Sequence, residues 1–143
     1  MTDTTQIRDQ DDVLATNERL TAENQRLMVE LTAATELLEA GQVQLIMVSV
    51  DPGRDTPEKL AEYVKHFYPT FIGGTNTPEE IASIASLYGI FYEVSGQTTS
   101  NGDYLIDHTA TLMAIDRDGF LKVVFPFGIT SDELTDDLKY MLR

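Results

Sequence analysis

Cysteine is absent from all 143 residues of the chain. Without a thiol, the chain forms no disulfide, has no cysteine nucleophile and offers no thiolate to a metal ion. Basic residues are scarce, because 10 lysines and arginines stand against 24 aspartates and glutamates, for a formal net charge of −14. This charge argues against binding to nucleic acid or to an anionic membrane surface, since both require a basic face. It fits an acidic soluble surface, a basic partner or a cation.

Long apolar segments are missing as well. Residues 1–12 are polar and contain neither the basic start nor the apolar stretch of a secretory signal. No apolar run approaches the roughly 20 residues that a membrane-spanning helix needs. We therefore expect no export signal and no membrane anchor within this chain, and the compartment stays open. A hydrophobic content of 42% still provides for one domain with a core.

Residues 13–40 have the apolar spacing of a single long helix, and Gly41 follows where such a helix ends. The helix either packs on its own domain or forms a coiled coil between two copies, and asparagines in one row weaken the second alternative. We divide the chain into an acidic tail with a helical extension, residues 1–26, and a domain, residues 27–143. Two rows repeat at intervals of seven: Val13, Leu20, Leu27 and Ala34, and Asn17, Asn24, Leu31 and Leu38.

The remaining residues predict an α/β domain with a mixed sheet and flanking helices. Residues 43–50 are almost entirely apolar, as in a strand buried on both faces. Helices are predicted to start at Thr56, at Thr77 with a capping box to Glu80, and at Thr130 with a capping box to Glu133. Further predictions are a turn at Gly73-Gly74, strands at 91–94, 109–115 and 120–125, and a polar loop at 95–102.

Three acidic residues lie close together after the first apolar strand. Asp51, Asp55 and Glu58 suggest a site for a hard cation. The same residues suit a helix start, because carboxylates are favoured at the positive end of a helix. The thioethers of Met28, Met47 and Met113 are soft donors, but we interpret them as core residues. No serine, histidine and aspartate pattern indicates catalysis, so we expect no enzyme and assign no catalytic or cofactor-binding residue.

Four segments of the sequence resemble the SCO/SenC family. They are VQLIMVSVDPGRDTPEKLAEYVKHF (43–67), FIGGTNTPEEIASIASLYGI (71–90), DYLIDHTATLMAIDRDG (103–119) and FPFGITSDEL (125–134). The VDP-x-RDTP and DYLIDH motifs are specific in combination, although either alone is a weak signal. The resemblance extends over residues 28–143.

The resemblance implies a thioredoxin-like fold and a role in copper delivery during assembly of cytochrome c oxidase. Family members are tethered to a membrane in the periplasm or the mitochondrial intermembrane space, and their partners are oxidase subunits and copper donors. They hold copper through two cysteines of a C-x-x-x-C motif and one distant histidine. His108 matches that histidine. Asp107 precedes it and would orient it from outside the metal site; alternatively, His108 is an inherited loop residue without a present task.

The chain departs from the family where the cysteine motif should lie. The residues before Met28 contain no cysteine and do not resemble a strand. In the family, the strand that leads into the motif is central, and residues 43–50 and 109–115 should flank it. Without it, these strands either pair directly, or share an edge with another copy, or belong to a fragment of a longer protein. We favour self-association, with a homodimer as the simplest form.

Two functions follow from these features. The first is an SCO/SenC-like copper protein that has no cofactor site of its own, with copper implied only by the resemblance. Because it lacks cysteine, it should neither bind Cu(I) tightly nor carry out thiol redox chemistry. The alternative is a non-catalytic binding or oligomerisation module, in which the helix over residues 13–40 supplies the interface and a degenerate thioredoxin-like scaffold the rest.

Overall fold

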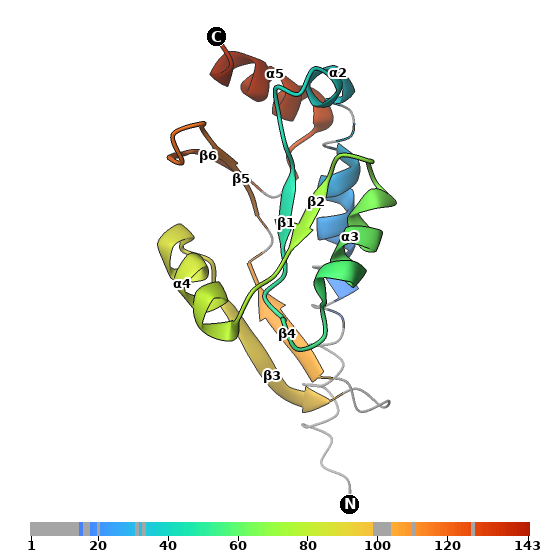
Figure 1. The fold of residues 1–143 in the computed structure, drawn as a ribbon, viewed down its shortest axis with the longest axis vertical. Helices are drawn as coiled ribbons and strands as arrows, with labels where there is room; N and C mark the ends of the chain where they lie inside the picture. Colours follow the sequence, from blue (N-terminus) through green and yellow to red (C-terminus); the bar gives the residue numbers. More distant parts are fainter. Residues whose placement is uncertain are drawn as a thin grey trace, which may run out of the picture.

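The computed structural model describes residues 15, 18–19, 21–30, 32, 34–98, 104–109, 111–126 and 128–143, without the side chains of residues 95–98. A helix over residues 21–30 comes first, and the predicted α/β class is confirmed (Figure 1). Among the described residues, no helix is long and apolar enough to span a membrane. The labelled elements are α2 (Thr35–Glu39), β1 (Ile46–Val48), α3 (Pro57–Lys65), β2 (Ile72–Gly74), α4 (Pro78–Tyr88), β3 (Tyr92–Thr98), β4 (Tyr104–His108), β5 (Leu112–Ile115), β6 (Leu121–Phe125) and α5 (Ser131–Met141).

The strands form three separate pairs. β1 lies parallel to β2, β3 antiparallel to β4, and β5 antiparallel to β6. In the described part of the chain, no ladder joins β1 to β5. The two apolar strands of the sequence analysis have therefore not closed up on each other, and the mixed sheet is divided into pairs.

Helix starts lie where the sequence predicts them. The hydroxyl of Thr56 accepts a hydrogen bond from the backbone N–H of Lys59 at the start of α3. The capping box of α5 is complete between Thr130 and Glu133, as predicted. At α4 only half of the predicted box is made, since the backbone N–H of Thr77 donates to the neighbouring Asn76 side chain. A residue outside the four-residue motif thus competes for the donor.

The prediction of one unbroken helix over residues 13–40 is wrong, because a turn at Ala34 separates residues 21–30 from α2. Ala34 has φ −78° and ψ 31°, outside the helical region. The break lets Leu27 and Leu38 enter the same core from two directions. These two residues and Ala34 belong to the seven-residue rows, so their burial favours packing on the chain's own domain over a coiled coil. The rows' other members, except Asn24, lie outside the described residues.

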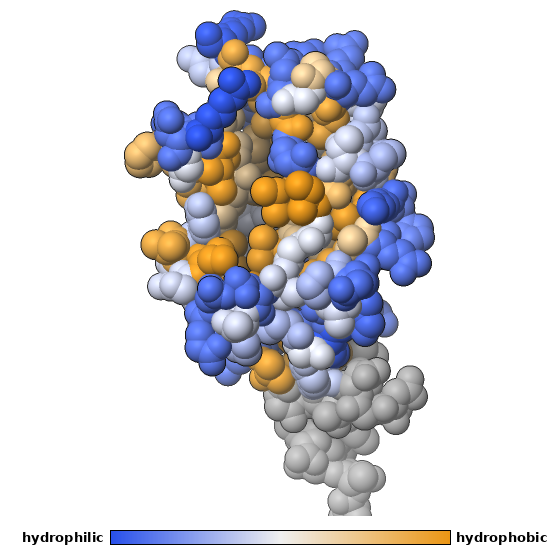
Figure 2. Space-filling view, viewed as in Figure 1, coloured by the Kyte–Doolittle hydropathy of each residue, from blue (hydrophilic) through white to orange (hydrophobic). Residues whose placement is uncertain are grey.

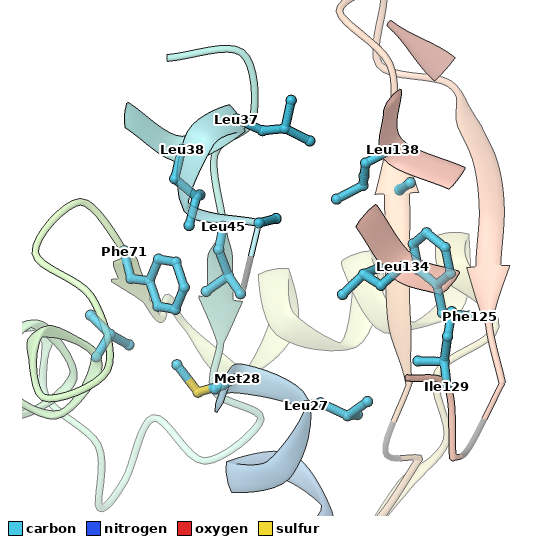
Figure 3. Packing of buried hydrophobic residues seen from close by; sticks show 13 residues of the cluster. Leu27, Met28, Leu37, Leu38, Leu45, Phe71, Phe125, Ile129, Leu134 and Leu138 are labelled. Atoms are coloured by element: carbon cyan, nitrogen blue, oxygen red, sulfur yellow. The ribbon is translucent and has the colours of Figure 1, made fainter. Parts of the chain in front are cut away.

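One apolar cluster joins the helices to strands of different pairs (Figure 3). Val64 of α3 and Leu134 of α5 are its most completely buried members, at 0% and 1% exposure. The cluster provides most of the apolar burial that stabilises the fold, since each buried aliphatic side chain contributes about 1.5–3 kcal/mol. Its members are Leu27, Met28, Ala34, Leu37, Leu38, Leu45, Val64, Phe71, Ala114, Phe125, Ile129, Leu134 and Leu138.

A hydrogen bond from Arg26 joins the helix over residues 21–30 to the segment before α5. Arg26 binds the buried carboxylate of Glu23 at 2.9 Å and donates to the backbone carbonyl of Ile129 at 3.1 Å. The hydrogen bond from Arg26 holds the pKa of Glu23 below its usual value. This helix runs across the boundary after residue 26, so the last residues of the predicted extension contact the domain.

Two strands, β2 and β4, were not predicted. β2 includes Gly73 and Gly74, for which a turn was predicted, and β4 lies over the DYLIDH motif, for which no element was predicted. The strand predicted over residues 91–94 is present as β3, but it continues through residue 98 into the predicted polar loop. Each of these strands is hydrogen-bonded to a partner strand, and the local apolar pattern of the sequence does not indicate that pairing. The hairpin of β5 and β6 is confirmed, with β5 beginning at Leu112.

Substituting Gly73 with alanine tests the close packing of α3 on β2. A Cβ at Gly73 would lie 2.8 Å from both the Cβ and the carbonyl oxygen of Leu60, whereas one at Gly74 meets nothing within 4 Å. We expect Gly73→Ala to lower the free energy of unfolding by about 1–3 kcal/mol, because the helix must move. Gly74→Ala is the matched control, with an expected change within about 0.5 kcal/mol. Urea denaturation measures both, and equal effects would contradict this packing.

Candidate functional site

His108 is the last residue of β4, where it lies opposite Tyr92 of β3. Its side chain is half-buried, and its Nδ1 lies 3.3 Å from the backbone carbonyl oxygen of Thr109. With the proton on Nδ1, the ring donates to that carbonyl and keeps the lone pair on Nε2. A neutral imidazole in this tautomer presents Nε2 as its ligand atom. The structure therefore positions a single nitrogen donor at the end of β4.

Asp107 lies one residue earlier on the same strand, opposite Glu93. Because successive side chains of a strand point to opposite faces, Asp107 and His108 face different sides of the hairpin. In the described part of the chain, the hydrogen bond recorded for the His108 ring goes to Thr109. An orienting role of Asp107 stays a prediction.

A polar cluster fastens β4 to the loop after β1, and we call it the Asp51 latch: Asp51, Arg54 and Tyr104. The hydroxyl of Tyr104 donates to Oδ1 of Asp51 at 2.7 Å. Arg54 forms an ion pair with the other oxygen of Asp51 and donates to the backbone carbonyl of Tyr104 at 2.7 Å. Its guanidinium carbon lies 4.1 Å from the centre of the Tyr104 ring, a stacked cation–π arrangement. The latch thus holds the first residue of the strand that ends at His108.

The acidic residues of the alternative cation site have other partners. Asp51 is buried and bound by the latch, and Asp55 accepts a hydrogen bond from the hydroxyl of Ser49. A hydrogen bond from its own backbone N–H is the largest cause that lowers the pKa of Glu58, at the start of α3. Among the described residues, no group of three or more histidine, cysteine, aspartate or glutamate side chains is arranged to hold a metal ion. These contacts favour the helix-start interpretation.

The latch shifts the pKa values of its members in a consistent way. Burial alone would raise the pKa of Asp51, but hydrogen bonds from Tyr104 and Arg54 outweigh it and lower that pKa. The hydrogen bond to Asp51 is the largest cause that raises the pKa of Tyr104. Each shift favours the protonation state that the latch needs, an ionised Asp51 and a neutral Tyr104.

Tyr104 was not predicted as a functional residue. From the sequence, the DYLIDH motif indicates a histidine ligand and the VDP-x-RDTP motif a helix start, with no sign of a contact between them. In the structure, Asp51 and Arg54 of one motif contact Tyr104 of the other. The only available signal was that the two motifs are specific in combination.

The other soft or basic donors lie elsewhere. Met28 is buried in the core cluster, and Met47 packs against it from β1. The Nδ1 of His66 lies 2.8 Å from the carbonyl oxygen of Glu62 at the end of α3. The described contacts thus assign Met28 and Met47 to packing, as the sequence suggested, and His66 to a helix terminus.

Removing the phenolic hydroxyl tests the latch. Tyr104→Phe should keep the ring beside Arg54 but lower the free energy of unfolding at neutral pH, because buried Asp51 loses a donor. The lowered pKa of Asp51 gives stability that is present above its unfolded value of 3.8 and is lost as pH falls through the folded pKa. The raised pKa of Tyr104 gives stability that is present below pH 10.0 and is lost as pH rises through the folded pKa.

The difference in stability between Tyr104→Phe and the unchanged chain should therefore shrink at both extremes of pH. Urea denaturation from pH 3 to pH 11 measures it, on the scale set by the two unshifted values. Tyr140→Phe is the control, because Tyr140 is 74% exposed on α5. A difference that stays constant over the whole range would show that the hydroxyl stabilises the fold by another route.

Comparison with known proteins identifies the family. The sequence matches the SCO1/SenC family over residues 21–143. An SCO2-like protein of Rickettsia prowazekii is 31% identical over 112 residues, which cover 77% of this chain and 55% of that protein. The mitochondrial SCO1 homolog 1 of Arabidopsis thaliana is 33% identical over 119 residues, 81% of this chain and 35% of that protein. The chain thus spans about half or less of the length of these relatives.

Solved structures show the same fold. Apo Sco1 of Thermus thermophilus superposes with a TM-score of 0.69 at 34% identity, covering 80% of this chain and 68% of the other. ScoI of Arabidopsis thaliana with copper bound gives 0.71 at 32% identity, covering 81% and 73%. The thioredoxin-like fold predicted from the resemblance is therefore confirmed. With its match over residues 21–143, this chain belongs to the SCO1/SenC family.

Proposed function

We propose that this chain acts in copper handling for the assembly of cytochrome c oxidase, and that it does so without being an enzyme. The observation that supports this proposal is the contact between the two family motifs. The Asp51 latch joins the VDP-x-RDTP segment to β4, and β4 ends at the residue that matches the family's copper-binding histidine, His108. Copper is cargo in such a function rather than a resident cofactor.

The donors of the chain do not fit a tight Cu(I) site. Cu(I) is a soft ion that prefers thiolate and thioether ligands, and the chain has no cysteine. Met28 is 5% exposed and belongs to the core, so its sulfur is committed to packing. His108 then supplies one imidazole, which cannot by itself replace a ligand set of two thiolates and a histidine. Tight binding requires thiolates from outside this sequence.

A Cu(I) titration tests this proposal. With a competing chromogenic chelator, the chain should bind Cu(I) with a dissociation constant above about 1 nM. Because His108 is the proposed donor, His108→Ala should weaken the residual binding further. His66→Ala is the matched control, since His66 sits at the end of α3, and it should leave binding unchanged. A tighter site in the unchanged chain, or equal losses in the two variants, would contradict the proposal.

A second candidate function is the binding of another polypeptide on a non-catalytic thioredoxin-like scaffold. One observation favours it: β1 and β5 belong to different strand pairs, and no described strand is paired with the remaining edge of either. The self-association expected from the sequence is one form of such binding. Oxidase subunits and copper donors, the partners that the family resemblance implies, are another form.

A further inference from the structure

One edge of β1 offers backbone groups that no described strand uses. Leu45 accepts from the N–H of Ile72, and Ser49 donates to the carbonyl of Gly74, so the odd-numbered residues turn their backbone groups towards β2. Because these directions alternate along a strand, Ile46 and Val48 turn theirs to the opposite edge. No ladder occupies that edge in the described part of the chain. An apolar strand with a free edge is a template for another strand.

β5 borders the same core from the other side. Ala114 of β5 and Leu45 next to β1 belong to one cluster, and Figure 1 places β5 on the side of β1 that is turned away from β2. β5 pairs only with β6 among the described strands, so its second edge is also without a ladder. The free edges of β1 and β5 therefore flank one region next to the core.

The surface around the two edges is apolar. Ile46 and Val48 of β1 are 62% and 46% exposed, and Ile115 of β5 is 45% exposed. Figure 2 shows apolar surface over the position of β1 and β2, more over β5 and β6, and a hollow between them. Exposed apolar surface beside unused backbone donors and acceptors is typical of an interaction site. Other exposed apolar residues of these elements and of α4 are Ile72, Ile84, Leu87, Leu121 and Val124.

We propose that this region, the strand slot between β1 and β5, binds an extended apolar segment of another protein, one without net negative charge, by β-strand addition. The inference rests on the second candidate function and names its site and ligand. Only an extended segment satisfies both edges at once, because a strand carries donors and acceptors on each side. Alternate side chains of the segment would cover Val48 and Ile115.

Among the described strands, a second copy of this chain offers none that suits the slot. All six described strands of a copy are already paired, so donating one would break an existing ladder. Pairing β1 of one copy with β1 of another would still leave β5 without a partner. Each copy also carries a net charge of −14, and like charges oppose close association. These points favour a neutral or basic segment of a different protein.

The test uses the full chain and a synthetic peptide of alternating valine and threonine flanked by lysines. Fluorescence anisotropy measures binding of the labelled peptide, and amide hydrogen exchange locates it. We expect one peptide per chain, new protection at Ile46, Val48 and β5, and weaker binding as salt rises. The same peptide with glutamates in place of lysines should bind at least about tenfold more weakly, since the chain is acidic.

Two controls separate strand addition from nonspecific apolar contact. Val48→Pro removes a donor at the free edge and leaves the ladder to β2 intact, so it should weaken binding about tenfold. If that variant does not fold, an N-methylated peptide with the same side chains tests the same hydrogen bonds on the unchanged chain. Tyr140→Lys, at an exposed position of α5, should leave peptide binding intact apart from the effect of one added positive charge.

Three results would overturn the inference. Protection of Ile46 and Val48 without peptide, together with a dimer in light scattering, would make a second copy the occupant. Peptide binding with protection elsewhere would keep the polypeptide-binding function but remove the strand slot. No binding by any peptide would remove both.

Discussion

Side-chain packing, rather than a continuous sheet, holds two of the three strand pairs of this domain together. β1 with β2 and β5 with β6 are separate pairs, and the core cluster reaches both. The helix over residues 21–30 contributes Leu27 and Met28, and α5 contributes Leu134 and Leu138. Because nonpolar contact is not directional, it can join elements that no ladder connects. It does not satisfy backbone groups, so the free edge of β1 persists beside a well-packed core.

The Asp51 latch supplies the directional contact that the core lacks. It ties the loop after β1 to the start of β4 through a carboxylate, a guanidinium and a phenol, each of which contacts the other two. Tyr104 begins β4, and His108 ends the same strand four residues further on, so the contacts of Tyr104 help to fix the position of His108. The end of a paired strand holds a metal ligand in a defined position, but a metal site also needs the right set of ligands. His108 has such a position, whereas the thiolates that give Cu(I) affinity are absent from the sequence.

Local sequence signals predict part of this structure, and the rest depends on contacts between residues far apart in the sequence. Thr56 and Thr130 cap helices as predicted, because a cap depends on residues within one turn. β2 and β4 escaped prediction because Gly73 and Gly74 resemble a turn and the DYLIDH motif has no alternating pattern. Their pairing with β1 and β3 lies beyond any local window. For the same reason His108 was found by resemblance, while Tyr104, whose partners lie about fifty residues away, was not.

The strand that would pair with both β1 and β5 and the thiolates that would bind copper are expected at the same place in the fold. The family resemblance implies that the strand between those corresponding to β1 and β5 leads directly into the C-x-x-x-C motif. A segment that fills the strand slot in the same direction would therefore be placed to bring thiolates towards His108. The copper affinity of the chain alone reports on its own metal-binding side chains. Peptide binding reports on the free backbone edges of β1 and β5. A strand that ended in C-x-x-x-C would couple the two quantities, since each ligand would stabilise the state that binds the other.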